Sequence, residues 1–314
     1  MRFGIIGTGF ISDWFVDACR LAGGTPIGIY SRDLERGQAF ADRHGLSLVV
    51  GSVEELAASD EIDAVYVASP IAAHHRQTAA VLDHGKPVLC EKTLATSPDE
   101  VADLFERADR AGCVLLEAVR PNHDPVYDLI RSALPRLGTL RHAHLEKCQY
   151  SSRYPAFLRG EVLNALDPAS GNSALRDIGV YCIHPSLLLF GTPLGTHRAS
   201  YRLPNGFEAG GSLLLDYGDL SVTCTYSKVA NSVTPSVILG EQGSLRIDSV
   251  AEPGAVEYVG LDGEVETLLT GSPRHPRETL HHPIEAFLEL CRQGRTDHPY
   301  RQLSLAAEQI MSTN

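Results

Sequence analysis

Lysine is scarce in this chain of 314 residues: lysine and arginine together number 27, and only four of them are lysines. One, Lys92, follows Glu91 at the end of the short apolar segment Pro87–Cys90. At the carboxyl end of a parallel strand, an ammonium group would lie on the ligand-binding edge of the sheet. There it could hydrogen-bond a substrate oxygen and lower the pKa of a neighbouring acid. We therefore favour a catalytic role for Lys92 over a surface role.

A second group of chemically useful side chains lies in the expected helix 173–190. Asp177, Tyr181 and His184 are spaced i, i+4 and i+7, so the pattern places them on one helix face. That face offers an acceptor, a phenol and an imidazole, which is unusual for a core-facing stripe. The alternative is a half-buried tyrosine and a structural histidine, each with local hydrogen bonds.

A glycine-rich turn opens the chain. Gly7-Thr8-Gly9-Phe10-Ile11-Ser12 follows the apolar segment Arg2–Ile6 and begins a helical pattern. Two glycines allow a tight turn and the close approach of a pyrophosphate, whose charge a helix N-terminus stabilises. The third position is Ser rather than Gly. The motif predicts a dinucleotide site, and the alternative is a βα turn without a ligand.

The second expected strand, Thr25–Tyr30, ends at Ser31, Arg32 and Asp33. An NAD site normally has an acid at this strand tip to bind the ribose 2′-hydroxyl, whereas a hydroxyl and a guanidinium suit a 2′-phosphate. Asp33 is expected to be the N-cap of the following helix. The cofactor is therefore predicted to be NADP, with NAD as the alternative.

Strand and helix patterns divide the chain into two domains. Residues 1–120 alternate six short apolar runs with helical patterns, which is typical of a doubly wound parallel sheet in an α/β Rossmann domain. Residues 121–314 contain a series of strands joined by turn residues, which predicts an α+β domain with a large, mostly antiparallel sheet. This second domain is expected to bind substrate and to form oligomers.

Composition excludes several classes of function. A net charge of −12 without a basic tract argues against a nucleic-acid partner. The apolar runs are far shorter than the ~20 residues of a membrane span, and no signal peptide is evident. Seven dispersed cysteines argue against a disulfide framework or a zinc knuckle and favour the cytoplasm. The pairs His74-His75 and His281-His282 lack enough acidic or thiolate neighbours for a metal site.

Taken together in chain order, several motifs resemble those of the Gfo/Idh/MocA oxidoreductase family. They are Gly7–Ile11, Ala68-Ser69-Pro70 with His74, Glu91-Lys92, Glu117-Ala118 and the segment 171–181. The resemblance covers nearly the whole chain. The Asp-x-Gly-x-Tyr form is similar to the branch of glucose–fructose oxidoreductase, dimeric dihydrodiol dehydrogenase and NADP xylose dehydrogenase. The inositol dehydrogenase branch typically has His in place of Tyr181.

The resemblance implies an NAD(P)-dependent oxidoreductase that acts on a secondary alcohol or sugar hydroxyl, as in a polyol, an aldose or a trans-diol. Tyr181 would be the acid/base, assisted by Lys92, and Asp177 would orient the substrate or the lysine. A free phenol, with a pKa near 10, benefits from an ammonium neighbour. The implied cofactor contacts are Gly7, Thr8, Gly9, Phe10, Ile11, Ser31, Arg32, Ser69, Pro70, His74, Glu91 and Lys92.

Substrate contacts are expected from polar and aromatic side chains on segments that should approach the cleft, namely Arg120, His123, Tyr150, Arg153, Tyr154 and His184. Thr93 stands where the family has proline, so the loop that aims Lys92 is expected to be less rigid. A homodimer or homotetramer through the C-terminal sheet is implied. The alternatives are a non-catalytic NADP-binding regulator and a glycoside hydrolase that acts by transient oxidation with tightly held NAD.

Overall fold

The computed structural model describes residues 1–313, which form two compact units. The first contains Met1–Val119 and Arg277–Glu308, and the second contains Arg120–Pro276 with the residues after Glu308. The division near residue 120 is close to the predicted one. The predicted second domain, however, included Arg277–Glu308, which instead belongs to the first unit. Among the residues described, no helix is both long and apolar enough to cross a membrane.

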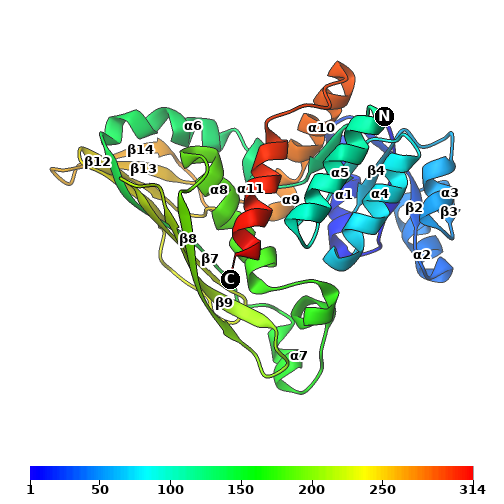
Figure 1. Ribbon diagram of the computed structural model, residues 1–314, viewed down its shortest axis with the longest axis horizontal. Coiled ribbons are helices and arrows are strands. Elements are labelled where there is room, and N and C mark those ends of the chain that lie inside the picture. The colour runs from blue at the N-terminus through cyan, green and yellow to red at the C-terminus, as the bar shows by residue number, and fades with distance from the viewer. Residues whose placement is uncertain (314) are drawn as a thin grey trace. The chain divides into compact units, whose positions relative to one another are not determined.

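The first unit has the predicted Rossmann architecture: a parallel six-stranded sheet in the order β3-β2-β1-β4-β5-β6 (Figure 1). Its strands are β1 (Arg2–Ile6), β2 (Thr25–Tyr30), β3 (Leu48–Val50), β4 (Ala64–Val67), β5 (Val88–Cys90) and β6 (Leu115–Glu117). The connecting helices are α1 (Phe10–Leu21), α2 (Leu34–His44), α3 (Val53–Ala58), α4 (His74–Asp83) and α5 (Pro98–Ala111), with the turn η1 (Ile71–Ala73) before α4. The short α3 was not predicted, because six residues carry too little helical periodicity.

The core of the first unit needs a segment from the far end of the chain. On one side of the sheet, the rings of Phe3 and Phe15 meet edge to face with their centroids 5.5 Å apart. The ring of Phe15 also stacks on that of Tyr66, with the centroids 3.7 Å apart. Phe287 of α10 (His281–Gln293) lies 5.9 Å from Phe3 and is fully buried. The short α9 (Pro276–Thr279) precedes α10, and α11 (Tyr300–Ser312) follows it.

The second unit contains the predicted large sheet, with eight strands in the order β14-β13-β12-β11-β7-β10-β9-β8 (Figure 1). All neighbours pair antiparallel except β7 and β10, which are parallel. The strands are β7 (Leu140–Cys148), β8 (Gly195–Arg202), β9 (Glu208–Asp216), β10 (Ser221–Ser227), β11 (Ser236–Gly240), β12 (Gly243–Ile247), β13 (Val256–Gly260) and β14 (Val265–Leu269).

Asp177, Tyr181 and His184 lie on a helical segment of the second unit, as predicted. The expected helix 173–190 begins with a π-helical turn, η6 (Leu175–Gly179), and continues as α8 (Val180–Phe190), which packs on β7 and β10. Such wide turns often occur at functional sites. The remaining helical segments are η2 (Arg120–His123), α6 (Val126–Ala133), η3 (Leu134–Leu137), α7 (Tyr154–Leu158), η4 (Asn164–Leu166) and η5 (Pro168–Ser170).

Candidate active site and cofactor site

The carboxyl ends of the parallel strands bring the predicted cofactor segments to one edge of the first sheet. Gly7 has a φ of +106°, and a Cβ there would lie 2.6 Å from the carbonyl oxygen of Ala68, so only glycine fits. Gly9 precedes α1, and a Cβ on it would face open space. Backbone N–H groups in the first turn of α1 could therefore receive a pyrophosphate close to the main chain.

The tip of β2 carries the predicted 2′-phosphate determinants. Ser31 is nearly buried and its Oγ accepts the Asp33 N–H at 3.3 Å, whereas Arg32 is exposed. Asp33 caps α2 by accepting the Arg36 N–H at 3.1 Å, as predicted. The cap occupies Asp33 Oδ1 within its own helix. Arg32 and Asp33 are both exposed at the strand tip, and of the two only the guanidinium of Arg32 carries the positive charge that suits a phosphate.

Lys92 lies on a loop whose backbone is held by buried side chains. Its own N–H donates to Glu91 Oε2 at 3.3 Å, and Tyr66 donates its hydroxyl to Glu91 Oε1 at 2.6 Å. Thr93 Oγ1 donates to the Ala95 carbonyl at 3.2 Å. The Lys92–Thr93 peptide bond is cis. These hydrogen bonds anchor the backbone of the Lys92 loop.

His74 joins two loops at the same edge of the sheet. Its Nδ1 lies 2.8 Å from the Thr93 carbonyl oxygen, and its Nε2 lies 2.8 Å from that of Ser69. Burial lowers the pKa of His74, against the opposing effect of both carbonyls. Ser69 Oγ also donates to Gln77 at 2.5 Å, and Pro70 is exposed beside it. A neutral imidazole carries one N–H, so His74 can donate to only one of these two carbonyls, and its ring lies between the backbones of Ser69 and Thr93.

In the second unit, the carboxylate of Asp177 forms an ion pair with Lys228, a residue that the sequence analysis did not select. Lys228 is 4% exposed, donates to the Ala165 carbonyl at 3.0 Å and lies 5.7 Å from the centre of the Phe207 ring. The scarcity of lysine, which singled out Lys92, applies equally to Lys228. That signal could have identified it.

Tyr181 lies against a buried ionic network. The guanidinium of Arg120 lies over its ring at 4.8 Å and pairs with Glu252, which also accepts from Lys147 at 3.1 Å. Burial alone would raise the pKa of Glu252, but the charges of Arg120 and Lys147 lower it. A guanidinium over an aromatic face is attracted by the ring's negative face. Arg120, predicted to contact substrate, therefore supports Tyr181 from a position that is only 5% exposed.

The other predicted substrate residues differ in exposure. His184 is fully buried, with Asn122 Nδ2 3.0 Å from its Nδ1, and burial lowers its pKa to about 3. His123 is half-buried at the end of η2. Tyr150 and Tyr154 are more accessible and meet edge to face at 5.5 Å next to the exposed Arg153. The structure therefore brings together Tyr150, Arg153 and Tyr154 on one segment.

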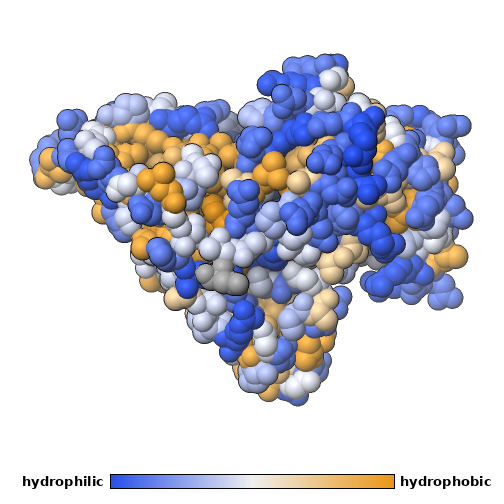
Figure 2. Space-filling model, in the orientation of Figure 1, coloured by the Kyte–Doolittle hydropathy of each residue, from blue (hydrophilic) through white to orange (hydrophobic). Residues whose placement is uncertain are grey.

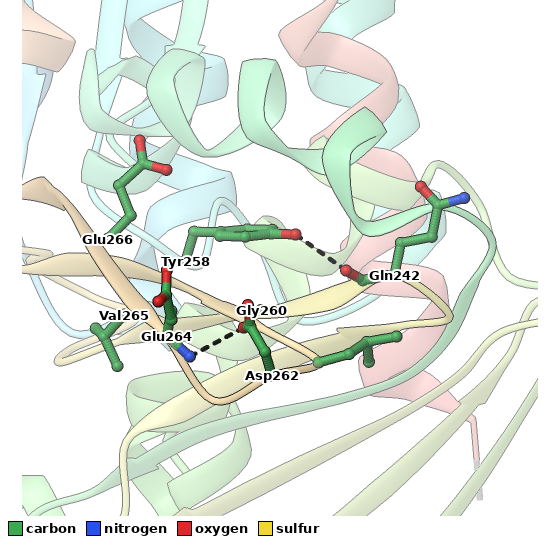
Figure 3. Close-up of a pocket in the computed structure, with 8 residues that line it drawn as sticks. Gln242, Tyr258, Gly260, Asp262, Glu264, Val265 and Glu266 are labelled. Carbon is green, nitrogen blue, oxygen red and sulfur yellow. Dashed lines mark hydrogen bonds between the residues drawn. The ribbon is translucent and has the colours of Figure 1, made fainter.

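Two further features lie outside the predicted site. Glu285 brings a carboxylate to the pair His281 and His282, so three ligand-type atoms lie within 4.8 Å of one another at the start of α10. The positive end of a helix disfavours a cation there. A pocket of about 510 Å³ lies at the β13–β14 hairpin and is lined by Gln242, Tyr258, Gly260, Leu261, Asp262, Glu264, Val265 and Glu266 (Figure 3). Its three carboxylates would repel a dinucleotide.

Residues 1–119 match the model of an oxidoreductase family with an NAD-binding Rossmann fold. The chain is 37% identical over 298 residues to the scyllo-inositol 2-dehydrogenase (NADP(+)) IolU of Bacillus subtilis (strain 168), covering 95% of this chain and 90% of that protein. It is 29% identical over 256 residues to trans-1,2-dihydrobenzene-1,2-diol dehydrogenase of Xenopus tropicalis, covering 79% and 75%.

Among solved structures, KijD10, a 3-ketoreductase from Actinomadura kijaniata in complex with NADP and TDP-benzene, superposes with a TM-score of 0.85. The identity is 24%, and the match covers 99% of this chain and 96% of that chain. At this identity the likeness shows the fold, which is the predicted combination of a Rossmann unit and a largely antiparallel sheet.

Proposed function

Because the chain belongs to the Gfo/Idh/MocA family of oxidoreductases, we propose that it is an NADP-dependent dehydrogenase acting on a secondary alcohol of a sugar-like ring. The observation that carries this proposal is the edge of the first sheet. There, the glycine turn at Gly7 and the exposed Arg32 meet the same edge as the loop of Lys92. This edge offers a dinucleotide site and an ammonium group suited to a substrate oxygen.

The proposed substrate has a hydroxyl next to the reacting carbon on a six-membered ring. One relative, 37% identical to this chain, is named for inositol, and another, 29% identical, is named for a dihydrobenzenediol. Both names describe rings with vicinal hydroxyl groups. The side chains of Tyr150, Arg153 and Tyr154 offer polar and aromatic contacts of the kind such a ring accepts. A cyclic polyol or trans-diol is therefore preferred over an open-chain alcohol.

In the proposed reaction, Tyr181 removes the hydroxyl proton and Lys92 hydrogen-bonds the substrate oxygen. Bound NADP supplies the hydride acceptor at the nicotinamide ring. In oxidation, Tyr181 would accept the hydroxyl proton as its phenolate and become a neutral phenol, while the carbinol carbon would give up a hydride to the bound cofactor, which leaves a ketone; reduction would reverse both transfers. Asp177, paired with Lys228, orients the substrate hydroxyls. Arg120 and Glu252 hold the ring of Tyr181 in place.

The second unit is also proposed to form a homodimer or homotetramer in the cytoplasm. Leu214 and Leu239 are 41% and 37% exposed on the sheet, and strand pairing places them on its solvent-facing side. Hydrophobic residues form patches on the visible surface of this unit, whereas the visible surface of the first unit is mainly hydrophilic (Figure 2). All seven cysteines, which lie in the described part of the chain, are free thiols, which supports a reducing compartment. Analytical ultracentrifugation measures the oligomeric state.

The proposal is tested by cofactor titration and a substrate panel. NADPH and NADH binding are followed by fluorescence, and oxidation of inositols, trans-dihydrodiols and aldoses is followed by absorbance of the reduced nicotinamide. We expect tighter binding of NADPH and turnover of a vicinal ring diol. Tight binding without turnover of any secondary alcohol would instead favour a non-catalytic regulator. Tight retention of NAD would favour hydrolysis by transient oxidation.

A further inference from the structure

Three consecutive backbone groups of the Lys92 loop are held by three different side chains of the first unit. The Lys92 N–H donates to Glu91, the Thr93 carbonyl lies 2.8 Å from His74 Nδ1, and the Leu94 N–H donates to Glu117 Oε1 at 2.9 Å. All three side chains are buried. The direction in which Lys92 points is therefore set by these anchors, and their protonation states matter for the loop.

Glu117 is the anchor that joins the loop to a distant part of the chain. It ends β6, where strand pairing places it opposite Cys90, immediately before Glu91. Its carboxylate also accepts a hydrogen bond from the hydroxyl of Ser304 on α11. Glu308, one turn later on the same helix, is 1% exposed. Glu117 thus lies between the loop of Lys92 and the helix that completes the first unit.

We propose that Glu117 is a positioning residue for Lys92: its carboxylate fixes the loop through the Leu94 amide, and protonation of that carboxylate weakens the hold. The inference rests on the proposed function, because it assumes that Lys92 acts on the substrate. A protonated carboxyl keeps one poorer acceptor and gains a donor, so it cannot accept from both Leu94 and Ser304 equally well.

Burial and nearby negative charges bring the protonation of Glu117 close to neutral pH. Burial raises the pKa of Glu117 to about 7, and the negative charges of Glu308 and Glu91 act in the same direction. Hydrogen bonds from Ser304 and from the Leu94 amide oppose the rise. Other titratable or charged groups on the elements packed here are Cys90, whose pKa is raised well above its ordinary value, His74 and His298, whose pKa values are lowered, and Lys92, Tyr300 and Arg301.

The experiment is a kcat profile from pH 5.5 to 8.5 with NADPH affinity measured in parallel. The wild-type kcat is expected to fall on the acidic side with a midpoint near 7. Glu117→Ala should lower kcat about 10- to 100-fold, the scale for a misplaced catalytic group, while KM for NADPH changes little. Glu117→Gln carries a neutral side chain like the protonated carboxyl, so it should show the reduced kcat of the acidic wild type at every pH, above that of Glu117→Ala because its amide oxygen still accepts from Leu94, and it should remove the acidic fall near 7.

Two variants that leave the loop contact intact provide opposite controls. Glu308→Gln removes a negative charge and should shift the acidic midpoint to lower pH. Ser304→Ala removes a donor to the carboxylate and should shift it to higher pH. These shifts keep the test informative if Glu117→Ala fails to fold.

Lys92→Ala distinguishes failure of the positioning role of Glu117 from failure of the catalytic role of Lys92. If Lys92→Ala is nearly inactive while Glu117→Ala keeps the wild-type kcat, or Glu117→Gln keeps the wild-type acidic midpoint, the positioning role is wrong and the proposed function stands. If neither Glu308→Gln nor Ser304→Ala moves the midpoint, the positioning role is also wrong. If Lys92→Ala keeps wild-type turnover, the proposed role of Lys92 fails, and the inference fails with it.

Discussion

Single charged side chains determine the proposed cofactor preference. Arg32 is exposed at the tip of β2, while the neighbouring Asp33 caps α2 and accepts from the Arg36 amide. An acid used as a helix cap does not need to bind a ribose hydroxyl, so the guanidinium becomes the main determinant at this tip. The preference for NADP over NAD should therefore depend on Arg32.

Arg32→Ala is expected to weaken NADPH binding by about 1.5–3 kcal/mol, the value of a lost charge-assisted hydrogen bond, and to change NADH binding little. Isothermal titration with both cofactors measures the difference. Arg110→Ala, which removes an exposed arginine paired only loosely with Glu106 at 3.9 Å, is the matched control. Equal losses for the two cofactors would show that Arg32 does not bind the 2′-phosphate.

His184 should make the fold sensitive to acid. Burial lowers its pKa to about 3, below the usual value near 6.5, so the unfolded chain binds this proton more readily than the folded one. The stability linked to His184 is therefore present above pH 6.5 and is lost as the pH falls toward 3. Between pH 6.5 and 5 the loss is about 2 kcal/mol.

Urea unfolding at pH 7, 6 and 5 measures this effect. The wild-type free energy of unfolding should fall more steeply with decreasing pH than that of His184→Gln, which has no titrating ring at this position. His74 and His298, whose pKa values burial also lowers, contribute equally to both proteins. Parallel pH dependences would contradict a buried neutral His184.

At the scale of elements, the turn between β1 and α1 determines how closely a pyrophosphate can approach the main chain. Gly7 needs its positive φ and lacks room for a Cβ, whereas Gly9 has room in front of it. The two glycines therefore serve different purposes. One permits the turn, and the other leaves open the space that the phosphates would occupy.

Gly7→Ala is expected to lower the free energy of unfolding by about 1–3 kcal/mol, because it forces a side chain into a strained conformation against Ala68. Gly9→Ala should change stability by less than about 0.5 kcal/mol and should still weaken NADPH binding. Thermal unfolding and fluorescence titration of both variants check this contrast. Undiminished NADPH affinity in Gly9→Ala would place the cofactor elsewhere.

Much of this element-level structure could be predicted from the sequence. Strands such as Arg2–Ile6 and Thr25–Tyr30 were predicted with the observed bounds, because buried parallel strands are continuous apolar runs between turn residues. The partners of the site residues could not be predicted. Lys228 lies 51 residues from Asp177, and Glu252 lies 132 residues from Arg120. Such contacts depend on tertiary packing, which leaves no periodic pattern in the sequence.

In the whole molecule, the first unit is completed by Arg277–Glu308, a segment that follows Arg120–Pro276 of the second unit in the sequence. Leu280, Ile284 and Phe287 are buried in the same core as Phe3 and Phe15. The sequence assigned this segment to the second domain because the pattern of an amphipathic helix does not say which core it covers. The first unit thus depends on residues close to the end of the chain.

Phe287→Ala should lower the free energy of unfolding by about 3–5 kcal/mol, the cost of removing a buried phenylalanine ring. Glu289→Ala, on the exposed side of the same helix, should change it by less than about 0.5 kcal/mol. Denaturant unfolding of both variants tests whether α10 is part of the first core. A loss below about 1 kcal/mol for Phe287→Ala would contradict that packing.

We propose that this chain transfers a hydride with Tyr181 as its proton-transfer group. The most direct measurement compares the steady-state turnover of the wild type and Tyr181→Phe on a vicinal ring diol with NADP. The substitution keeps the ring beneath Arg120 and removes only the hydroxyl. We predict that NADPH affinity and stability are retained while kcat falls by roughly 10²–10⁴, the scale of lost acid–base catalysis. A variant that turns over at nearly the wild-type rate would show that Tyr181 is not the proton-transfer group.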